Sequence, residues 1–465
     1  MTIRIEEIAE RTGPRYIALA DSIAQAIERG DLKPGDKLPT HRALADAMGV
    51  TIGTITRGYQ EAERRQLVSA RVGSGTFVRE AHPKLAMQGF GLPEHESDTD
   101  IDLGLSLSLS GPQSQLMAES LQQLSQEPAT LQALMSYQNE QGMAHQREGF
   151  AQWLTESGID GDAERLLICC GGQHAISIAL QTICRAGDLV LSEDLTYPGF
   201  IAAARQAQLR HIGLPMDDQG IDPQALENIC RQQKPRALYC MPALHNPTTV
   251  ETSAARREQI IDIARRYDLL LLEDDIQFND NANRPQALVN LAPERVFYIG
   301  SVSKVMAGGL RVGVLQTPQH WLSACAHSLR ANCWMAPPLM SELVYRWITQ
   351  GHHRELRQWQ RQELTDRHRL IDELLPDYQI AHPRYGYNAW LTLPTQWRAQ
   401  AFVEQAQHNG VMLKAAEAFA VGNVHAPQAV RFCISPVQDR QRLRKGLEAI
   451  RQTLEAIPPL DHAVM

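Results

Sequence analysis

The sequence predicts two folded parts: a small helical head with a β-hairpin, and a larger α/β body whose mostly parallel sheet carries helices on both faces. Three observations predict this. Apolar strand-like runs alternate with helical patterns from residue 103 onward, which is typical of a parallel sheet covered on both faces. Residues 15–79 show three helical patterns and then two short alternating segments. Residues 80–102 are polar, contain Pro and Gly and lack periodicity, as linkers do.

The composition fits a soluble protein of the reducing cytoplasm. Hydrophobic residues make up 43% of the chain and charged residues 21%. No apolar run is long enough to span a membrane, and the N-terminus lacks the apolar stretch of a secretory signal. The eight cysteines include no CxxC pair, so no metal site is expected. Cys169 and Cys170 lie in an apolar run and are expected to be buried.

Charge is distributed unevenly along the chain. Residues 1–79 carry 12 Lys and Arg against 10 Asp and Glu, whereas the other residues carry 33 against 43. Because phosphate contacts need local cationic groups, this asymmetry favours a DNA-binding head, assigned to residues 1–79, on an acidic body. Many solvated surfaces differ by as much, so charge alone decides nothing.

The head shows the pattern of a helix-turn-helix. Apolar residues recur at helical spacing on both sides of Gly49: Leu44, Ala47 and Met48, then Ile55, Tyr59 and Ala62. Gly49 supplies a tight turn, and Thr51 can cap the second helix. In such a unit the second helix enters the major groove of DNA. The alternating segments LVSAR and GTFVR, joined through residues 72–75, predict a hairpin wing.

The stretches DLKPGDKLPTHRALADAMGV and GSGTFV resemble the N-terminal domain of GntR-family transcription regulators over about residues 15–79. The resemblance implies five DNA-contacting residues: Arg42, Thr51, Thr54, Arg57 and Gly73 at the wing tip. Two positions depart from the family pattern, because Ile52 and Thr56 stand where an arginine is usual. Arg57, one residue displaced, is the expected substitute. The alternative is a head that serves only dimer contacts.

Five apolar runs predict the main sheet of the body: residues 165–170, 188–192, 236–241, 269–274 and 296–300. The chain beyond about residue 330 is mostly helical, with two further strands near 387–393 and 429–435. The body, residues 103–465, is therefore expected to hold a large lobe over about 135–330. A small lobe is expected from about 103–134 and 331–465.

A lysine motif follows one predicted strand directly. In GSVSKVMAGGLRVG (300–313), Lys304 lies beside small residues at a strand end. There it can be unhindered and lose its proton to a partly desolvated site, as imine formation requires. Arg311 can balance a phosphate dianion by bidentate contact. Taken alone, a Ser-Lys pair is more often an ordinary surface pair.

This motif and its neighbours resemble fold-type I enzymes of the aminotransferase class over roughly residues 100–455, which implies pyridoxal 5'-phosphate (PLP) as cofactor and an internal aldimine at Lys304. The implied phosphate contacts are Ser301, Ser303, Arg311, Gly172 and Gln173. The last two belong to CGGQHAISIAL, where free amides at a helix N-terminus favour an anion.

The resemblance also implies contacts to the cofactor ring. Tyr197 of LTYPGF would stack on the ring, and Asn246 of HNPTT would form a hydrogen bond with the ring hydroxyl. Asp274 of LLLLEDDI would pair with the ring nitrogen and keep it protonated; the alternative is a helix-capping acid. Lys304, Asp274 and Asn246 form the implied catalytic set.

Two further residues are implied by the same resemblance. Arg431 in AVRFCIS fits the arginine that grips a substrate or effector carboxylate. Tyr137 in SYQNEQG fits a tyrosine that reaches the phosphate of a neighbouring subunit, which implies a homodimer; the alternative is an ordinary core tyrosine. One departure stands out, because many relatives place a tyrosine two or three residues after the aspartate, where this chain has Ile276 and Gln277.

The order of the two parts resembles the MocR subfamily of GntR regulators. That resemblance implies a PLP-binding transcriptional regulator that binds an operator in double-stranded DNA and responds to PLP or to a small amine or amino acid. Two other functions stay open. One is a working class I/II aminotransferase that carries a DNA-binding head, and the other is a DNA-bridging dimer without a cofactor.

Overall fold

The computed structural model describes residues 14–28, 31–33, 35–64, 67–71, 75–78, 100–277, 284–422 and 424–457. The chain divides into two compact units, Met1–Gln88 and Gly89–Met465. Gly73 and residues 80–99 of the expected linker lie outside the described residues. Within the described part of the chain, no helix combines the length and the apolar character that crossing a membrane requires.

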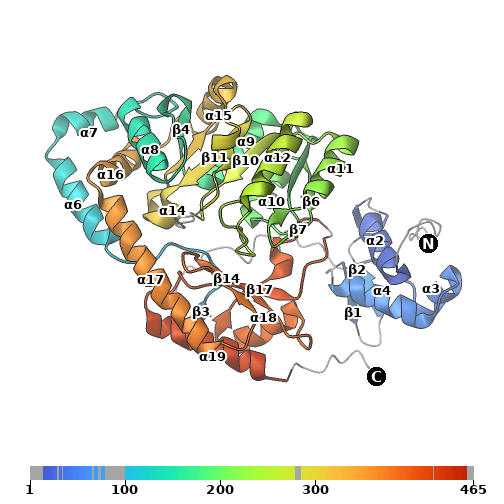
Figure 1. The fold of residues 1–465 in the computed structure, drawn as a ribbon. Helices are drawn as coiled ribbons and strands as arrows, with labels where there is room; N and C mark the ends of the chain where they lie inside the picture. The colour runs from blue at the N-terminus through green and yellow to red at the C-terminus, as the bar shows by residue number, and fades with distance from the viewer. Residues whose placement is uncertain are drawn as a thin grey trace. The chain divides into compact units, whose positions relative to one another are not determined.

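The head has the three helices and the hairpin that the sequence predicts (Figure 1): α2 (Arg15–Glu28), α3 (His41–Met48), α4 (Ile52–Arg64), β1 (Val68–Arg71) and β2 (Gly75–Val78). Gly49 ends α3 with a φ of 63°, and the Thr54 amide donates a 3.3 Å hydrogen bond to Thr51 Oγ1 at the start of α4. The expected turn at Gly49 and the expected helix cap at Thr51 are therefore confirmed. One detail is corrected, because Ala47 is exposed and Ala45 joins Leu44 in the core.

The body contains a seven-stranded sheet in the order β4-β12-β11-β10-β9-β5-β6. Its strands are β4 (Leu166–Cys169), β5 (Leu189–Glu193), β6 (Arg210–Leu214), β9 (Ala237–Cys240), β10 (Leu270–Asp274), β11 (Val296–Ser301) and β12 (Gly313–Gln316). All five predicted strands are confirmed, and only β12 runs antiparallel to its neighbours. Two strands were not predicted: β6, a half-exposed edge strand, and β12, which directly follows the lysine motif in the chain.

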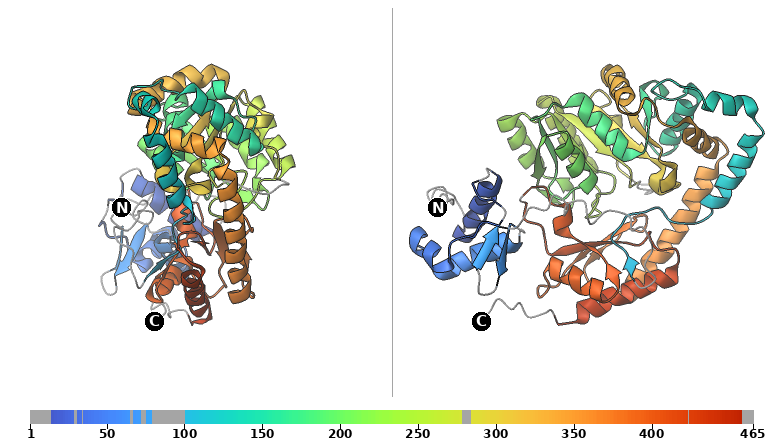
Figure 2. Two further views of the ribbon diagram at one scale, coloured as in Figure 1. Left: turned by 90° about the vertical axis from the view of Figure 1, so that its left-hand side faces the viewer. Right: turned by 180° about the vertical axis from the view of Figure 1, so that it is seen from behind.

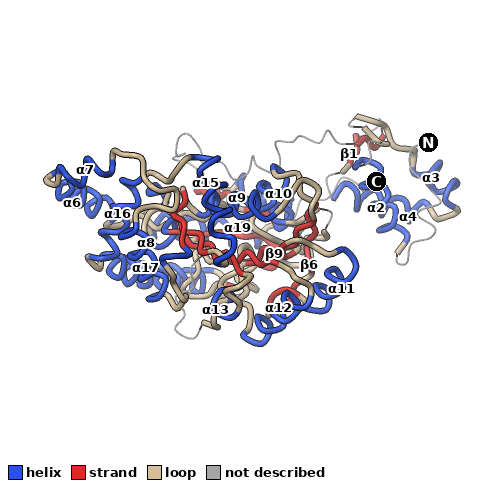
Figure 3. Tube along the Cα trace, turned by 90° about the horizontal axis from the view of Figure 1, so that it is seen from above, coloured by secondary structure: helices blue, strands red, loops and turns tan. Residues whose placement is uncertain are grey.

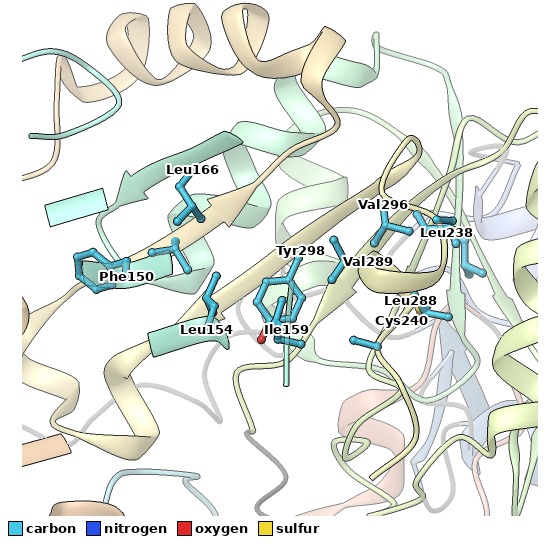
Figure 4. Packing of buried hydrophobic residues seen from close by; sticks show 14 of the residues in the cluster. Phe150, Leu154, Ile159, Leu166, Leu238, Cys240, Leu288, Val289, Val296 and Tyr298 are labelled. Atoms are coloured by element: carbon cyan, nitrogen blue, oxygen red, sulfur yellow. The ribbon is translucent and has the colours of Figure 1, made fainter. Parts of the chain in front are cut away.

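Side chains of one strand alternate between two cores, as the strand period of two requires. Val296 and Tyr298 of β11 belong to one core (Figure 4), and Phe297 and Ile299 belong to the other. The first core is covered mainly by α8 (Ala144–Glu156), α11 (Pro223–Gln233), α12 (Ala254–Arg266), α13 (Leu288–Leu291) and α16 (Pro338–Thr349). The second is covered by α9 (Gly172–Ile183), α10 (Pro198–Gln206) and α15 (Leu322–Cys333). Figure 3 shows the strands between these helix layers.

A smaller lobe has its own sheet and core. Its four strands are β13 (Ile380–Ala381), β14 (Asn388–Thr392), β17 (Ala429–Cys433) and β16 (Lys414–Ala415), packed against α18 (Ala399–His408) and α19 (Arg440–Glu455). The long helix α17 (His352–Leu374) connects the two lobes (Figure 2), because Leu356 packs in the main core and Leu364 in the small one. Two short pairs, β3 (Ile101–Asp102) with β15 (Val411–Met412) and β7 (Met216–Asp217) with β8 (Gly220–Ile221), complete the strands.

The expected domain boundaries need two corrections. Residues 101–102 form β3 within the body, so the body begins before residue 103. Helices α6 (Gln113–Ser125), α7 (Pro128–Leu134) and α16 belong with the large lobe, not the small one. Leu124 and Leu134 pack against Leu343 of α16, and α16 itself packs in the main core. Hydrophobic burial against α16, which sequence periodicity does not reveal, decides this assignment.

Candidate functional site

The predicted site residues converge on one edge of the main sheet. Lys304 follows β11 in the short helix α14 (Val302–Val305), Asp274 ends β10, and Asn246 lies in the loop after β9. Gly172 and Tyr197 follow β4 and β5. These strands run in the same direction, so their carboxyl ends meet at one edge, where open α/β sheets bind ligands.

Lys304 is held in a partly buried position. Its ammonium nitrogen donates to the backbone oxygen of Ser106. Its own backbone oxygen accepts hydrogen bonds from Gln360 Nε2 at 2.9 Å and from the Tyr387 hydroxyl at 3.2 Å. Burial lowers the pKa of Lys304 to about 8. A substantial fraction of this amine is therefore neutral and nucleophilic near physiological pH.

Asp274 is buried and carries two hydrogen bonds. Its Oδ2 accepts a 2.6 Å bond from the Tyr239 hydroxyl, and its Oδ1 accepts a 2.9 Å bond from the Ile276 amide. Burial raises the pKa of Asp274 to about 6, and these two bonds act in the opposite direction. The carboxyl group therefore stays largely ionised at pH 7, with acceptor capacity left on each oxygen for one more donor.

Asn246 and Arg431 are joined directly. Arg431 of β17 donates a 2.8 Å hydrogen bond from Nη1 to Asn246 Oδ1, and its Nη2 donates to the Gly104 backbone oxygen. The guanidinium also lies 4.7 Å from the ring centroid of Phe419. Both Asn246 and Arg431 are buried, so an acceptor group that reached them would meet a desolvated, pre-oriented donor.

The predicted phosphate contacts gather at the start of α9. A Cβ on Gly172 would lie 2.0 Å from Ile276 Cδ1, and one on Gly171 would lie 2.5 Å from Arg311 Nη2. Gly171 also has a φ of 83°, which favours glycine, and a side chain at either position would push Ile276 or Arg311 away from this turn. Ser301 Oγ and Ser303 Oγ share a 2.8 Å hydrogen bond. Gln173 Oε1 is buried without a hydrogen-bond partner, which leaves it available to a donor.

Tyr197 lies against the same turn. A Cβ on Gly199 would meet Tyr197 Cε1 and Gln173 Oε1, each at 2.3 Å, so glycine lets both side chains approach. Burial raises the pKa of the Tyr197 hydroxyl, and the neighbouring Asp274 charge adds to this effect. Tyr197 therefore remains a neutral aromatic within electrostatic reach of Asp274.

Sequence reasoning missed two parts of this site. The segment after β3 supplies Ser106 and Gly104, the partners of Lys304 and Arg431. The alternation of Leu and Ser over residues 105–110 was the available signal. Tyr239 was the other omission, although a tyrosine in an otherwise apolar strand was visible. Tyr239 of β9 lies opposite Leu272 of β10. Asp274 follows Leu272 by two residues, so Tyr239 and Asp274 lie on the same face of the sheet.

The structure corrects the expected burial of Cys170 and decides between the two alternatives for Tyr137. Cys169 is buried as predicted, but Cys170 is only half-buried, because the chain turns out of the strand there. Tyr137 is 81% exposed, so the alternative of a core tyrosine is wrong. Its ring centroid lies 5.6 Å from that of Trp334, which is itself exposed. Together they form an exposed apolar patch, termed here the Tyr137 patch, and Met135, two residues before Tyr137 in the chain, is exposed as well.

In the head, Arg42, Thr51 and Arg57 are exposed, and Thr54 is half-buried. Thr51 Oγ1 and Thr54 Oγ1 lie 3.0 Å apart in a mutual hydrogen bond at the start of α4. The residues of α4 that are expected to contact DNA therefore begin at its N-terminal turn and extend to Arg57, about one helical turn later.

Two family models match this chain. Residues 101–450 match the aminotransferase class I and II family, and residues 15–78 match the bacterial regulatory proteins of the gntR family.

Similar proteins agree with this division. An uncharacterized HTH-type transcriptional regulator, YdeF of Bacillus subtilis, is 30% identical over 454 residues, covering 95% of each chain. YjiR of Escherichia coli, also named an HTH-type transcriptional regulator, is 27% identical and covers 95% of this chain and 98% of its own. Among solved structures, kynurenine aminotransferase of Pyrococcus horikoshii in complex with PMP matches with a TM-score of 0.69 at 22% identity, covering 77% of this chain and 91% of its own.

Proposed function

This chain belongs to the aminotransferase class I and II family and carries a gntR-family domain before its aminotransferase-like part. This is the domain order of the MocR subfamily. On that premise we propose that the chain is a PLP-binding transcriptional regulator. The head would bind an operator in double-stranded DNA. The body would sense PLP or a small amine or amino acid through Lys304. One observation carries the proposal: a partly buried Lys304 and the buried Asp274 and Arg431 converge in a chain that also holds a winged helix-turn-helix.

The residues present fit PLP. The turn at Gly171 and Gly172 is packed closely against Arg311 and Ile276 and opens helix α9, whose free N-terminal amides suit a phosphate. Gln173 would contact the phosphate through its backbone amide in this first turn, because its side-chain oxygen can only accept a hydrogen bond. Arg311, Ser301 and Ser303 would complete the phosphate contacts, Tyr197 would cover the ring, and Asn246 would bond the ring hydroxyl.

PLP, when bound, supplies an aldehyde and an electron-withdrawing ring. The chain's own residues do the remaining work. Lys304 presents an amine whose pKa of about 8 leaves it partly neutral. Asp274 would accept the ring N–H and hold that proton on the nitrogen. Arg431 would bind an effector carboxylate, and for this it would exchange its bond to Asn246.

Regulation requires that a ligand bind two states of the protein with different affinity. Helix α17 supports such coupling, because it packs in both cores and its Gln360 holds the backbone of Lys304. Binding DNA also fits the cytoplasmic location that the sequence predicts. DNase footprinting of the operator with and without PLP and candidate amines tests the proposal. Identical protection under all conditions would remove the sensing function.

A second function, a working aminotransferase, is favoured by one observation. Lys304, Asp274, Asn246 and Arg431 are all present and buried or partly buried together. A coupled assay with amino donors and 2-oxoglutarate separates the two functions. Sustained turnover of about 1 per second or more would favour the enzyme, whereas a regulator would show spectral changes without turnover.

The Tyr137 patch supports a homodimer as part of the same proposal. Met135 is 87% exposed, Tyr137 81% and Trp334 49%, and large apolar side chains grouped on a surface mark interaction sites. In a homodimer Tyr137 would reach the cofactor phosphate of the second subunit.

A further inference from the structure

A cluster of three metal-ligating side chains lies beside the turn at Gly171. One ligand atom each of Cys170, His174 and Cys333 lies within 4.8 Å of the other two. Cys170 follows β4, His174 lies in the first turn of α9, and Cys333 ends α15. Helices α9 and α15 share one core. We propose that these three residues bind a soft cation of the Zn²⁺ class.

The donor set and its spacing fit such an ion. Two thiolates and one imidazole are ligands that Zn²⁺ prefers, and three protein ligands leave a fourth tetrahedral position for water. Zn–S bonds of about 2.3 Å place two sulfurs about 3.8 Å apart in a tetrahedron. Ligand atoms already within 4.8 Å therefore need to move by only about 1 Å.

His174 distinguishes a cation site from a redox pair. Its Nδ1 accepts a 3.0 Å hydrogen bond from the Cys170 amide, and its Nε2 is buried without a hydrogen bond that meets normal geometry. Asn332 is a further polar neighbour of this ring. A disulfide between Cys170 and Cys333 would leave the imidazole unused, whereas a cation uses all three side chains. Cys333 is exposed in the single chain, which gives an ion a path from solvent before a dimer forms at the neighbouring Trp334.

The position of the site gives it a consequence that depends on the proposed function. The Cys170 backbone oxygen accepts a 3.2 Å hydrogen bond from Arg311 Nη2, and Gly171 follows directly. A cation bound by Cys170, His174 and Cys333 would tie the first turn of α9 to the end of α15. It would thereby order the backbone that is proposed to hold the PLP phosphate, so we expect tighter PLP binding when the cation is present.

The test uses full-length, tag-free protein that has been reduced and stripped of metal. Zn²⁺ is titrated against a chromophoric chelator, and Co²⁺ is added separately to reveal thiolate-to-cobalt absorption. We expect one ion per chain with a thiolate band. Removing a ligand by Cys170→Ser, Cys333→Ser or His174→Ala should weaken binding by more than about 100-fold, because losing even an outer-shell partner costs about 10–100-fold.

Cys184→Ser is the matched control, because Cys184 is half-buried at the other end of α9, and it should bind as the unmodified chain does. Circular dichroism checks that each variant is folded. Absence of a thiolate band, or a band unchanged in both Cys170→Ser and Cys333→Ser, overturns the site. Two thiols that join as a disulfide and bind no ion after reduction also overturn it. If Zn²⁺ binds but PLP affinity does not change, only the coupling is wrong.

Discussion

The hydroxyl of Tyr239 donates a 2.6 Å hydrogen bond to Asp274 from the neighbouring strand. Phe200 stacks on the Tyr239 ring, with centroids 4.0 Å apart, so the hydroxyl is held in place. Ile276 and Gln277 stand where the family pattern has a tyrosine, and Tyr239 instead binds the carboxylate of Asp274. Tyr239 therefore acts on Asp274 itself, because its hydrogen bond lowers the pKa of that carboxyl group.

Tyr239→Phe should weaken PLP binding at pH 7. The pKa of Asp274 is already raised to about 6 by burial, and the Tyr239 bond lowers it. Without that bond the pKa rises further, a smaller fraction is ionised at pH 7, and binding recovers as the pH increases. A hydrogen bond to a charged group contributes about 1.5–3 kcal/mol, so we expect a loss of about tenfold or more. PLP titrations followed by absorbance at several pH values measure this.

Tyr298→Phe is the matched control, since Tyr298 donates a 2.9 Å bond to Asp275, the next acid along the chain. An equal loss of PLP affinity in both variants would show that the effect is general destabilisation.

Covalent attachment of PLP to Lys304 should rise with pH through about 8 and level off above it. Burial lowers the pKa of this amine to about 8, and only the neutral form attacks a carbonyl. Borohydride fixation of stoichiometric PLP, followed by peptide mapping, measures it. Lys304→Ala should fix none at position 304, whereas Lys234→Ala, at an exposed helix end, should behave normally. Fixation that is independent of pH contradicts the prediction.

Arg431→Gln should reduce the affinity for amino acids but not for the corresponding amines without a carboxylate. A charge-assisted contact contributes about 1.5–3 kcal/mol, which corresponds to about 10–100-fold. Spectral titration of the PLP-loaded protein with matched pairs of an amino acid and its decarboxylated amine measures this difference. Equal losses for both members of a pair would contradict a carboxylate contact. Arg431→Lys should lose less than Arg431→Gln, because it keeps the charge.

Arg57→Ala should weaken operator binding and reduce its salt dependence. A phosphate contact contributes about one unit to the slope of log affinity against log salt concentration. Fluorescence anisotropy at several salt concentrations measures this slope. Gln60→Ala is the control on the same helix, because Gln60 is also exposed but uncharged. An unchanged slope for Arg57→Ala would mean that Thr51, Thr54 and Arg42 act without it.

Trp334→Asp should shift the protein from dimer toward monomer. Burying a large apolar side chain contributes about 1.5–3 kcal/mol, so the dimer should weaken by about 10–100-fold. Sedimentation analysis measures the shift, and Ile457→Asp, another exposed apolar position at 90% exposure, is the control. Tyr137→Phe should keep the dimer but lower PLP affinity, since it removes only the hydroxyl. Equal sedimentation of Trp334→Asp and the unmodified chain would contradict a dimer at this surface.

Local patterns predicted most of the elements that build the site. Strand endings at Asp274 and Lys304, the glycine turn before α9 and the capped turn before α4 are all short-range features. Each depends on a few neighbouring residues whose backbone preferences act locally. The family resemblance assigned Asp274, Lys304 and the glycine turn to one site, and the parallel strands explain why these three meet at one sheet edge.

Contacts between distant segments required the tertiary structure. The chain order does not reveal that Tyr239 reaches Asp274, that Ser106 meets Lys304, or that Cys333 comes close to Cys170 and His174. The assignment of α6 and α7 to the large lobe likewise depended on packing against α16. Sequence periodicity specifies which face of an element is buried, but the partner on that face is selected by side-chain packing across the whole fold.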